Sequence, residues 1–339
     1  MMNLNLKNSQ IIFDDFEKSL KKLLPKDKKI IVLTDENVNK LYGKSFSNFP
    51  VIEIGLGEGI KTLQTIEFII DKLIEFEADR HSFLLGIGGG IVCDITGFAA
   101  SVYMRGIDFA FVSTTLLSQV DASIGGKNGV NFSSYKNIIG NFNQPKFVVC
   151  DTKMLSTLPK KEIKCGLGEI IKHALIADAE MFDLISENYE KILDLDEKIL
   201  PKLIFDNIKI KANIVEQDEK EQGERKKLNF GHTLAHAIEK HSDLSHGEAL
   251  AVGIIFASKI SLQKGYLSDI EYDKIKETLI KYELPTELNI EKEKIFNAIK
   301  KDKKRNAEKI SFVLLSEIGN AKIEDISLND LKQYLDDLC

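Results

Sequence analysis

The chain has 339 residues, of which 43% are hydrophobic and 29% charged, and its formal net charge is −6. This is the composition of a water-soluble globular protein, and the length exceeds what one ordinary core organises, so we expect two domains. The negative charge argues against a general nucleic-acid binder, and the longest apolar run, residues 249–257, is far short of a bilayer span.

The cysteines and the N-terminus indicate the compartment. Four cysteines, Cys93, Cys150, Cys165 and Cys339, form neither a CxxC pair nor a disulfide framework. Residues 1–10 lack the basic-then-apolar pattern of a secretion signal. We therefore expect a reducing, cytoplasmic environment without a membrane.

Short apolar runs alternate with helical periodicity through the first half of the chain. Strands are predicted at 30–33, 83–85, 109–112 and 147–149, and helices at 63–73 and 91–103. Strand, helix and strand in succession predict an α/β domain with a mostly parallel sheet.

The pattern changes after residue 151 to helical periodicity alone. Helices are predicted at 167–185, 198–215, 228–241 and 248–264, with further helical segments in 270–300. We therefore divide the chain into an α/β domain, residues 1–155, and a mainly α-helical domain, residues 156–339.

Three glycines, Gly88, Gly89 and Gly90, stand between a predicted strand and a predicted helix. Glycine lets a phosphate approach the backbone, and the free N–H groups of a helix start attract it. The dinucleotide pattern G-x-G-x-x-G/A is incomplete, because Ile91 occupies its last position. A plain strand-to-helix turn remains the alternative.

A second glycine-rich segment, residues 121–129, holds Lys127. Asp121 and Asn128 occupy positions where a Walker A loop needs Gly and Ser or Thr, which excludes that nucleotide-triphosphate site. Lys127, Lys136 and Asn137 together would suit an anion, although each lysine alone is more often a surface charge.

Three of the six histidines, His232, His236 and His246, lie in one short stretch that also holds Arg225 and Asn229. His232 and His236 are four residues apart, which places both rings on one face of a helix. Imidazole is the commonest side-chain ligand for a transition metal, so we expect a divalent-metal site here. A hydrogen-bonded structural histidine is the alternative for any single ring.

The metalloprotease motif H-E-x-x-H is absent, because Thr233 fills the position of the glutamate. Another helix carries Glu169, with Lys172 three residues later on the same face. A glutamate near a helix start usually only favours the helix dipole. As a metal ligand, Glu169 would have to meet His232 and His246 in space.

Several segments together resemble the 3-dehydroquinate synthase family. They are residues 88–98, 103–106, 114–117, 120–127, 136–140, 168–172, 229–232 and 246–248. The resemblance runs in order from about Asp35 to Lys304, which is nearly the whole chain. Cys93, Ser113 and Asn128 depart from the residues usual in the family, and none of them is an expected ligand.

The resemblance implies a Rossmann-like domain that binds NAD, a helical domain, and an active site between them. Glu169, His232 and His246 would hold zinc, with cobalt as a possible substitute, and His236 would instead face the substrate phosphate. The expected NAD contacts are Asp35, Asn37, Glu58, Lys61, Gly89, Gly90, Ile91, Asp94, Thr114, Thr115, Lys127, Lys136 and Thr157. The expected substrate and catalytic residues are Arg105, Asp121, Lys127, Lys136, Asn137, Lys172, Lys211, Arg225, Asn229, His236 and Lys304, or Lys303 in place of the last.

The implied reaction converts 3-deoxy-D-arabino-heptulosonate 7-phosphate to 3-dehydroquinate and phosphate, in the shikimate pathway of aromatic amino acid biosynthesis. Transient oxidation by NAD⁺ would acidify a C–H bond, phosphate would leave, and re-reduction and an internal aldol step would close the ring. The net reaction is that of a carbon–oxygen lyase on a sugar phosphate, and the family implies a homodimer.

Three alternatives remain at this stage. The first is another sugar phosphate cyclase, of the deoxy-inosose or valiolone type. The second is a metal- and NAD-dependent alcohol dehydrogenase of the glycerol dehydrogenase kind, which would accumulate NADH. The third is a non-catalytic metal- or nucleotide-binding module, which would release no phosphate.

Overall fold

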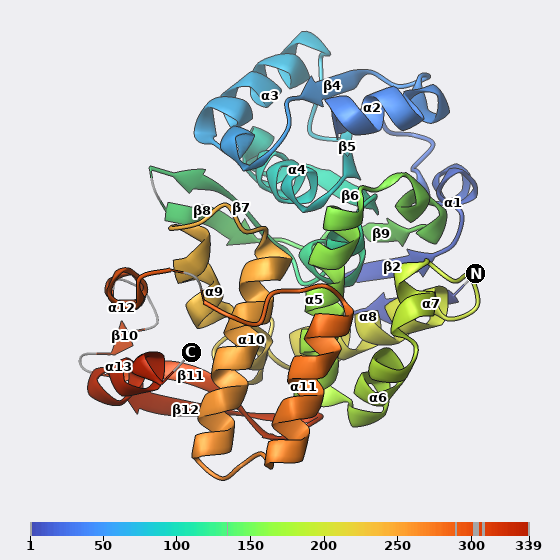
Figure 1. Ribbon diagram of the computed structural model, residues 1–339. Coiled ribbons are helices and arrows are strands. Elements are labelled where there is room, and N and C mark those ends of the chain that lie inside the picture. The colour runs from blue at the N-terminus through green and yellow to red at the C-terminus, as the bar shows by residue number, and fades with distance from the viewer. Residues whose placement is uncertain (1, 134, 289, 301–304, 307–308, 338–339) are drawn as a thin grey trace. The chain divides into compact units, whose positions relative to one another are not determined.

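Two compact units, Met1–Leu158 and Pro159–Cys339, make up the chain in the computed structural model (Figure 1). The structure describes residues 2–133, 135–288, 290–300, 305–306 and 309–337. The boundary expected after residue 155 falls inside the short helix η5 (Thr152–Thr157), just before the division between the units.

A seven-stranded sheet forms the centre of the first unit, in the order β1-β2-β9-β6-β5-β3-β4. Its strands are β1 (Met2–Leu6), β2 (Ser9–Phe13), β3 (Ile30–Asp35), β4 (Val51–Ile54), β5 (Phe83–Gly88), β6 (Asp108–Ser113) and β9 (Phe147–Cys150). Only the pairing of β1 with β2 is antiparallel. The mostly parallel sheet predicted from the sequence is confirmed, and each predicted strand lies within an observed one.

Helices cover both faces of this sheet, as its central strands, which are buried on both faces, require. Alternate residues of the strands, such as Ile30 and Val32, pack on one face against α1 (Phe16–Leu23), α2 (Glu36–Tyr42) and the short helix η1 (Gly43–Phe46). On the other face α4 (Gly90–Val102) contacts β3, β5 and β6, and α3 (Leu63–Glu75) packs on α4 and β4.

The strand order reverses direction between β3 and β5. From β3 the chain moves outward to β4, then returns to build β5, β6 and β9 on the other side of β3. Ligands of open α/β sheets bind beyond the carboxyl ends of the strands at such a reversal. Asp35 ends β3 and Gly88 ends β5, so these two residues flank the position where a cofactor is expected.

The glycine-rich segment 121–129 is not a simple loop. It passes from the π-helical turn η4 (Ser118–Ala122) into a hairpin of β7 (Lys127–Phe132) and β8 (Tyr135–Phe142). The buried Asn128 amide donates to the carbonyls of Gly126 and Asn143, both at 2.9 Å. Lys127 therefore begins a strand whose second residue, Asn128, is held by hydrogen bonds.

Two further short helices of the first unit are η2 (Glu58–Ile60) and η3 (Tyr103–Arg105).

The second unit is mainly helical, as predicted. Its helices are α5 (Lys160–Ala177), α6 (Ala179–Glu187), α7 (Tyr189–Leu193), α8 (Leu200–Gln217), η6 (Glu224–Asn229), α9 (His232–Glu239), α10 (His246–Gln263), α11 (Asp269–Lys281), α12 (Lys292–Lys300) and α13 (Leu328–Asp336). Buried residues surround α10 on nearly every side, and it contacts α5, α9 and α11. A helix that is apolar all round belongs in a core, so α10 is the axis of this unit.

The second unit differs from the prediction at several points. The helix expected over 228–241 is divided into η6 and α9 by the left-handed Gly231, and the helix expected from residue 167 already begins at Lys160. The helix expected over 167–185 is broken at Asp178, whose extended backbone ends α5 and whose carboxylate caps α6 at the Met181 N–H, 2.9 Å away. An antiparallel sheet of β10 (Arg305–Asn306), β11 (Lys309–Glu317) and β12 (Asn320–Ser327) was not predicted.

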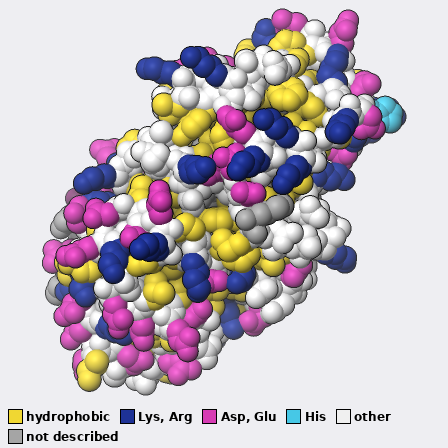
Figure 2. All heavy atoms as spheres, turned by 90° about the vertical axis from the view of Figure 1, so that its right-hand side faces the viewer, with side chains coloured by type: hydrophobic (Ala, Val, Ile, Leu, Met, Phe, Trp, Pro, Cys, Tyr) yellow, Lys and Arg dark blue, Asp and Glu magenta, His cyan; other side chains and the backbone are white. Residues whose placement is uncertain are grey.

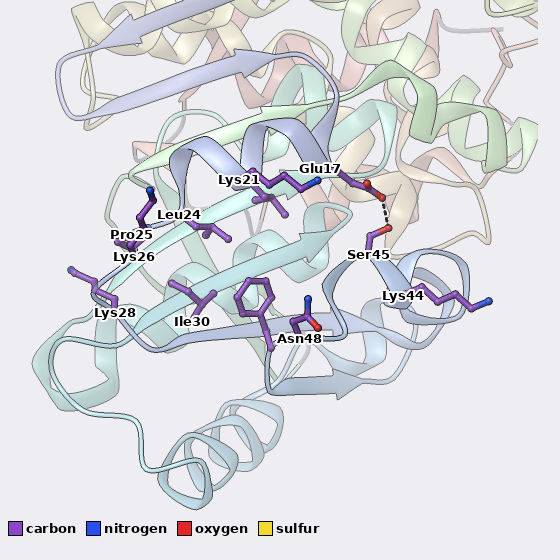
Figure 3. A pocket seen from close by; sticks show the side chains of 12 residues that line it. Glu17, Lys21, Leu24, Pro25, Lys26, Lys28, Ile30, Lys44, Ser45 and Asn48 are labelled. Atoms are coloured by element: carbon purple, nitrogen blue, oxygen red, sulfur yellow. Dashed lines mark hydrogen bonds between the residues drawn. The ribbon is translucent and has the colours of Figure 1, made fainter.

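The surface shows no large area of one charge on the face drawn in Figure 2, where Lys and Arg side chains are mixed with Asp and Glu. A hollow of about 680 Å³ in the first unit is lined partly by apolar side chains, which include Leu24 and Ile30 (Figure 3). Lys28 and Lys44, at its rim, extend in opposite directions, so their charges do not converge. Every helix within the described residues is too short or too polar to cross a bilayer.

Candidate functional site

Glu169, His232 and His246 come together in the second unit, although they stand on three different helices. The Oε1 atom of Glu169 lies 2.9 Å from Nε2 of His246 and 3.3 Å from Nε2 of His232. One ligand atom from each residue lies within 4.8 Å of the other two. The Glu169 side chain is fully buried, whereas those of His232 and His246 are 14% and 28% exposed. The trio is thus reached from the side of the imidazoles.

Glycines at the helix crossings make this convergence possible. A Cβ atom on Gly247, next to His246, would lie 2.5 Å from the Cα atom of Cys165 on α5. Gly168, next to Glu169, faces Gly247 in turn, with its Cβ position 3.3 Å from the Gly247 Cα atom. The backbones of α5 and α10 therefore touch where their ligands stand.

A second close approach places α9. Gly231, immediately before His232, has a left-handed backbone with φ of 77°. A Cβ atom on Gly253 of α10 would collide with the carbonyl oxygen of Gly231. Because α9 begins at this contact, His232 is fixed against the same helix that carries His246.

The second ring nitrogen of each imidazole is also occupied. Nδ1 of His232 lies 3.2 Å from the carbonyl oxygen of Phe230, and Nδ1 of His246 lies 2.9 Å from Oε1 of Glu239. Both acceptors favour a proton on Nδ1, so Nε2, the nitrogen that faces Glu169, is the one that a metal can bind once its proton is displaced. Two neutral imidazoles and a carboxylate match the His₂Glu donor set of catalytic zinc sites.

The charges around Glu169 favour its ionised form. Burial alone would raise the carboxyl pKa, but Lys172, whose Nζ lies 2.5 Å from Oε2, and the two imidazoles outweigh it and hold the pKa of Glu169 well below its usual range. Burial opposes a charged His246, yet Glu169 and Glu239 raise the pKa of His246 to about 10. Burial and Lys172 lower the pKa of His232. The ionised Glu169 carboxylate is therefore the group of this site that attracts a cation.

His173 and His236 lie beside this trio without joining it. His173 is fully buried, with Nδ1 at 2.9 Å from Oδ1 of Asn207 and Nε2 at 3.8 Å from Oε2 of Glu169. The His236 ring lies edge-on to that of His232, with centroids 5.4 Å apart. The four-residue spacing of His232 and His236 therefore brings their rings together, while the three converging donor atoms include only His232 of this pair.

Buried cationic side chains of the second unit belong to the predicted substrate set. Lys172, Lys211 and Arg225 are at most 6% exposed. Arg225 follows a turn held by the Asp218 carboxylate, which accepts from the N–H groups of Gln222, Gly223 and Arg225 at 2.7–3.1 Å. The Arg225 guanidinium donates to the Glu219 carbonyl, so its position is fixed by the fold.

The predicted cofactor residues of the first unit lie at the carboxyl edge of the sheet. Asp35 ends β3, Gly89 and Gly90 follow β5, and Thr114 follows β6 with its N–H 3.0 Å from the Gly88 carbonyl. A Cβ atom on Gly89 would lie 2.9 Å from the Thr115 side chain, so the turn has no room for a larger residue. Gly89, the N-cap residue of α4, has no side chain that could cap this helix. The N–H groups at the start of α4 therefore remain available to an anion.

Other predicted cofactor residues take part in local contacts. Lys61 forms an ion pair with Asp94, and the Glu58 carboxylate accepts from the Asn131 amide at 2.7 Å. Burial raises the pKa of Asp35, whose carboxylate caps α2. Asn37 and Thr157 are exposed, and Ile91 is half-buried in the first turn of α4. Of these residues, Lys61 is buried, at 4% exposed.

The predicted catalytic residues are divided between the units. Arg105, Lys127, Lys136 and Asn137 are exposed in the first unit, and Asp121 is half-buried there. Arg105 and Asn137 have left-handed backbones, with φ of 68° and 51°. Lys304, like Lys303, lies outside the described residues.

Two polar residues of this site were not predicted. Glu239 contacts His246, as described above, and Glu221 accepts a hydrogen bond from the amide of Asn229. The sequence spacing offered a signal for Glu239, which stands seven residues after His232 and seven before His246. Seven residues are about two helical turns, so Glu239 lies on the same face of its helix as His232. Nothing in the local sequence marked Glu221, whose backbone φ is 58°.

Comparisons with known proteins agree over almost the whole chain. The family model for the 3-dehydroquinate synthase N-terminal region matches residues 51–165, and that for the C-terminal region matches residues 166–305. A 3-dehydroquinate synthase of Campylobacter concisus (strain 13826) is 42% identical over 345 residues, which cover 98% of each chain.

Solved structures show the same fold. A 2-deoxy-scyllo-inosose synthase complexed with carbaglucose-6-phosphate, NAD⁺ and Co²⁺ has a TM-score of 0.89 and 24% identity, over 100% of both chains. A 2-epi-5-epi-valiolone synthase from Streptomyces hygroscopicus subsp. jinggangensis 5008, with NAD⁺ and Zn²⁺ bound, has a TM-score of 0.88 and 24% identity, over 99% of this chain and 98% of that one.

The glycine contact between α5 and α10 gives a graded prediction. Gly247→Ala places a methyl group against the Cys165 backbone and should separate Glu169 from His246, so zinc affinity should fall by at least about tenfold, the loss usual for a disturbed ligand shell. Gly168→Ala, with a looser contact, should lose less. Zinc titration against a chelating dye measures both, with Gly59→Ala, which meets open space, as the control. Equal affinity in all three variants would contradict the account.

Proposed function

Because the chain belongs to the 3-dehydroquinate synthase family, we propose that it converts 3-deoxy-D-arabino-heptulosonate 7-phosphate to 3-dehydroquinate and inorganic phosphate. The reaction is a carbon–oxygen lyase step in the biosynthesis of aromatic amino acids. The observation that carries the proposal is the convergence of Glu169, His232 and His246, in a chain matched to this family from residue 51 to residue 305.

The proposal assigns NAD to the carboxyl edge of the sheet in the first unit and a divalent metal to the trio in the second. Zinc suits the two imidazoles and the carboxylate, and cobalt is a substitute with the same ligand preference. When bound, NAD⁺ supplies the hydride acceptor and donor, and the metal supplies a Lewis acid. The protein's own contribution is binding, orientation and electrostatics.

The substrate carries a carboxylate and a phosphate, whereas the chain is acidic overall, so cations have to be gathered locally. Arg225 presents a planar donor set that suits a carboxylate or phosphate, and its fixed turn removes the entropy cost of ordering it. Lys127, Lys136 and Lys211 add positive charge, and His236 is assigned to the phosphate. Lys172, held at 2.5 Å from Glu169, keeps a cation beside the reacting hydroxyl groups.

We also infer that the protein is a homodimer in a reducing, cytoplasmic compartment. The family resemblance supports the dimer, and the free thiols of Cys93, Cys150 and Cys165 support the compartment. Sedimentation equilibrium should give about twice the mass of one 38.1 kDa chain. A single-chain mass at micromolar protein concentration would contradict the dimer.

A product assay tests the function directly. The purified chain, incubated with the heptulosonate phosphate, catalytic NAD⁺ and Zn²⁺, should release phosphate and 3-dehydroquinate in equal amounts with no net NADH. Exhaustive chelation should abolish the activity, and Zn²⁺ or Co²⁺ should restore it, because the metal supplies the Lewis acid.

Other outcomes of the assay would favour other functions. Steady NADH accumulation with a simple alcohol would favour a dehydrogenase, and turnover of a sugar phosphate lacking the carboxylate would favour another cyclase. Full activity after chelation would contradict the metal assignment. Heat-denatured protein and a reaction without NAD⁺ are the controls.

The Arg225 assignment makes a separate prediction. Arg225→Lys keeps the charge but loses the forked donor set, and a lost charge-assisted hydrogen bond is worth about 1.5–3 kcal/mol, so kcat/KM should fall about 10- to 150-fold. The exposed Arg80→Lys variant should match the wild type. Steady-state kinetics with the heptulosonate phosphate measure both variants, and zinc content should be unchanged. Wild-type kinetics for Arg225→Lys would remove this residue from the anion site.

A further inference from the structure

We propose that Glu239 is a positioning residue for the metal ligand His246, and that its carboxylate sets both the orientation of that imidazole and the charge of the metal site. The inference rests on the proposed function, because it takes the trio of Glu169, His232 and His246 as the metal site. Glu239 contacts the trio at His246.

The geometry places the His246 ring between two carboxylates. Nδ1 lies 2.9 Å from Oε1 of Glu239, and Nε2 lies 2.9 Å from Oε1 of Glu169. The Glu239 side chain is only 7% exposed, so the contact is shielded from solvent. A ring nitrogen bound in this way donates its proton to the carboxylate and presents the other nitrogen to a metal. Rotation of the His246 ring would break both contacts at once.

His246 and His232 differ in this respect. Nδ1 of His232 faces the neutral backbone carbonyl of Phe230, at 3.2 Å, whereas Nδ1 of His246 faces a carboxylate. A carboxylate partner makes the imidazole a stronger donor than a carbonyl does. The two histidine ligands therefore differ in donor strength. His246, whose Nδ1 faces the Glu239 carboxylate, should contribute more to metal affinity than His232.

The charge balance of the cluster also involves Glu239. Among the described candidate donors of the second unit, Glu169 supplies the carboxylate for a divalent cation, and Lys172 already contacts that carboxylate through Oε2. Glu239 adds a second negative charge without occupying a coordination position. Burying uncompensated positive charge is costly, so removal of the Glu239 charge should weaken the cation more than removal of a surface charge.

The same contact also links the end of α9 to the start of α10, so a purely structural tether has to be distinguished. The start of α10 has its own support, since the Glu248 carboxylate accepts from the Ser245 N–H at 2.7 Å in a capping box. Glu248 stands two residues from His246 and does not contact its ring in the described hydrogen bonds. Loss of that cap would loosen the helix start without changing the charge next to His246.

The test measures the zinc dissociation constant of the full chain by competition with a chelating dye. Glu239→Gln keeps an acceptor for Nδ1 but loses the charge, and should weaken zinc binding about tenfold; Glu239→Ala loses both, and should weaken it about 100-fold. Glu248→Ala, the matched control, should stay within about twofold. The absorption spectrum of the Co²⁺-loaded Glu239→Gln protein should also shift, because the donor strength of His246 changes.

Two results would overturn the inference while leaving the metal site intact. One is wild-type zinc affinity and an unchanged cobalt spectrum for Glu239→Gln. The other is an equal loss in Glu239→Ala and Glu248→Ala, which would assign the contact to the tether alone. If the wild-type chain itself binds no zinc, the failure belongs to the proposed function. Circular dichroism and the thermal midpoint identify any variant that is unfolded. If Glu239→Ala is unfolded, the zinc affinity of the nearly isosteric Glu239→Gln variant tests the inference.

Discussion

Contact between backbones at the crossing of α5 and α10 is the constraint on which the site depends. Packed helices ordinarily stand 8–10 Å apart because side chains fill the space between them. Here Gly168 and Gly247 leave no side chain at the crossing, and the residues that follow and precede them, Glu169 and His246, are brought within 2.9 Å. Gly231 and Gly253 do the same for α9 and His232.

This packing explains how a buried carboxylate is tolerated. A carboxylate such as Glu169, with no exposed surface, would normally take up a proton. The ammonium of Lys172 on one oxygen and two imidazoles on the other reverse that preference, and all three partners are held by rigid helices. The negative charge is therefore preorganised for a cation, and a cation needs little rearrangement to bind. The first unit prepares for its cofactor differently, through glycine turns at the edge of a parallel sheet.

Much of the architecture could be predicted because it depends on local sequence patterns. The strands at 30–33 and 83–85 and the helix at 63–73 were visible as apolar runs and 3.6-residue periodicity, and they lie within observed elements. The break at Asp178 was missed, although aspartate is a common N-cap residue: its carboxylate accepts a hydrogen bond from the N–H of Met181 in the first turn of α6. The sheet of β11 and β12 was missed, although the apolar run in β11 and the alternation of apolar and charged residues in β12 are both strand signals.

The site itself could be predicted only in part. The histidines were conspicuous, but their partner Glu169 lies 77 positions from His246, and no spacing rule connects residues that far apart. Resemblance to a family supplied that ligand set, whereas the spacing of Glu239 was not recognised as a signal and Glu221 required three-dimensional contacts. Glycines at helix crossings are also hard to interpret from sequence, because Gly247 lacks any local reason to be a glycine in the first turn of a helix.

X-ray absorption at the zinc edge of the loaded, full-length chain tests the central claim most directly. The account predicts one tightly bound zinc per chain with nitrogen and oxygen neighbours at about 2.0–2.2 Å, and an imidazole scattering pattern that weakens in His246→Ala. A shell containing sulfur at about 2.3 Å, or an unchanged spectrum in both His246→Ala and Glu169→Gln, would contradict it.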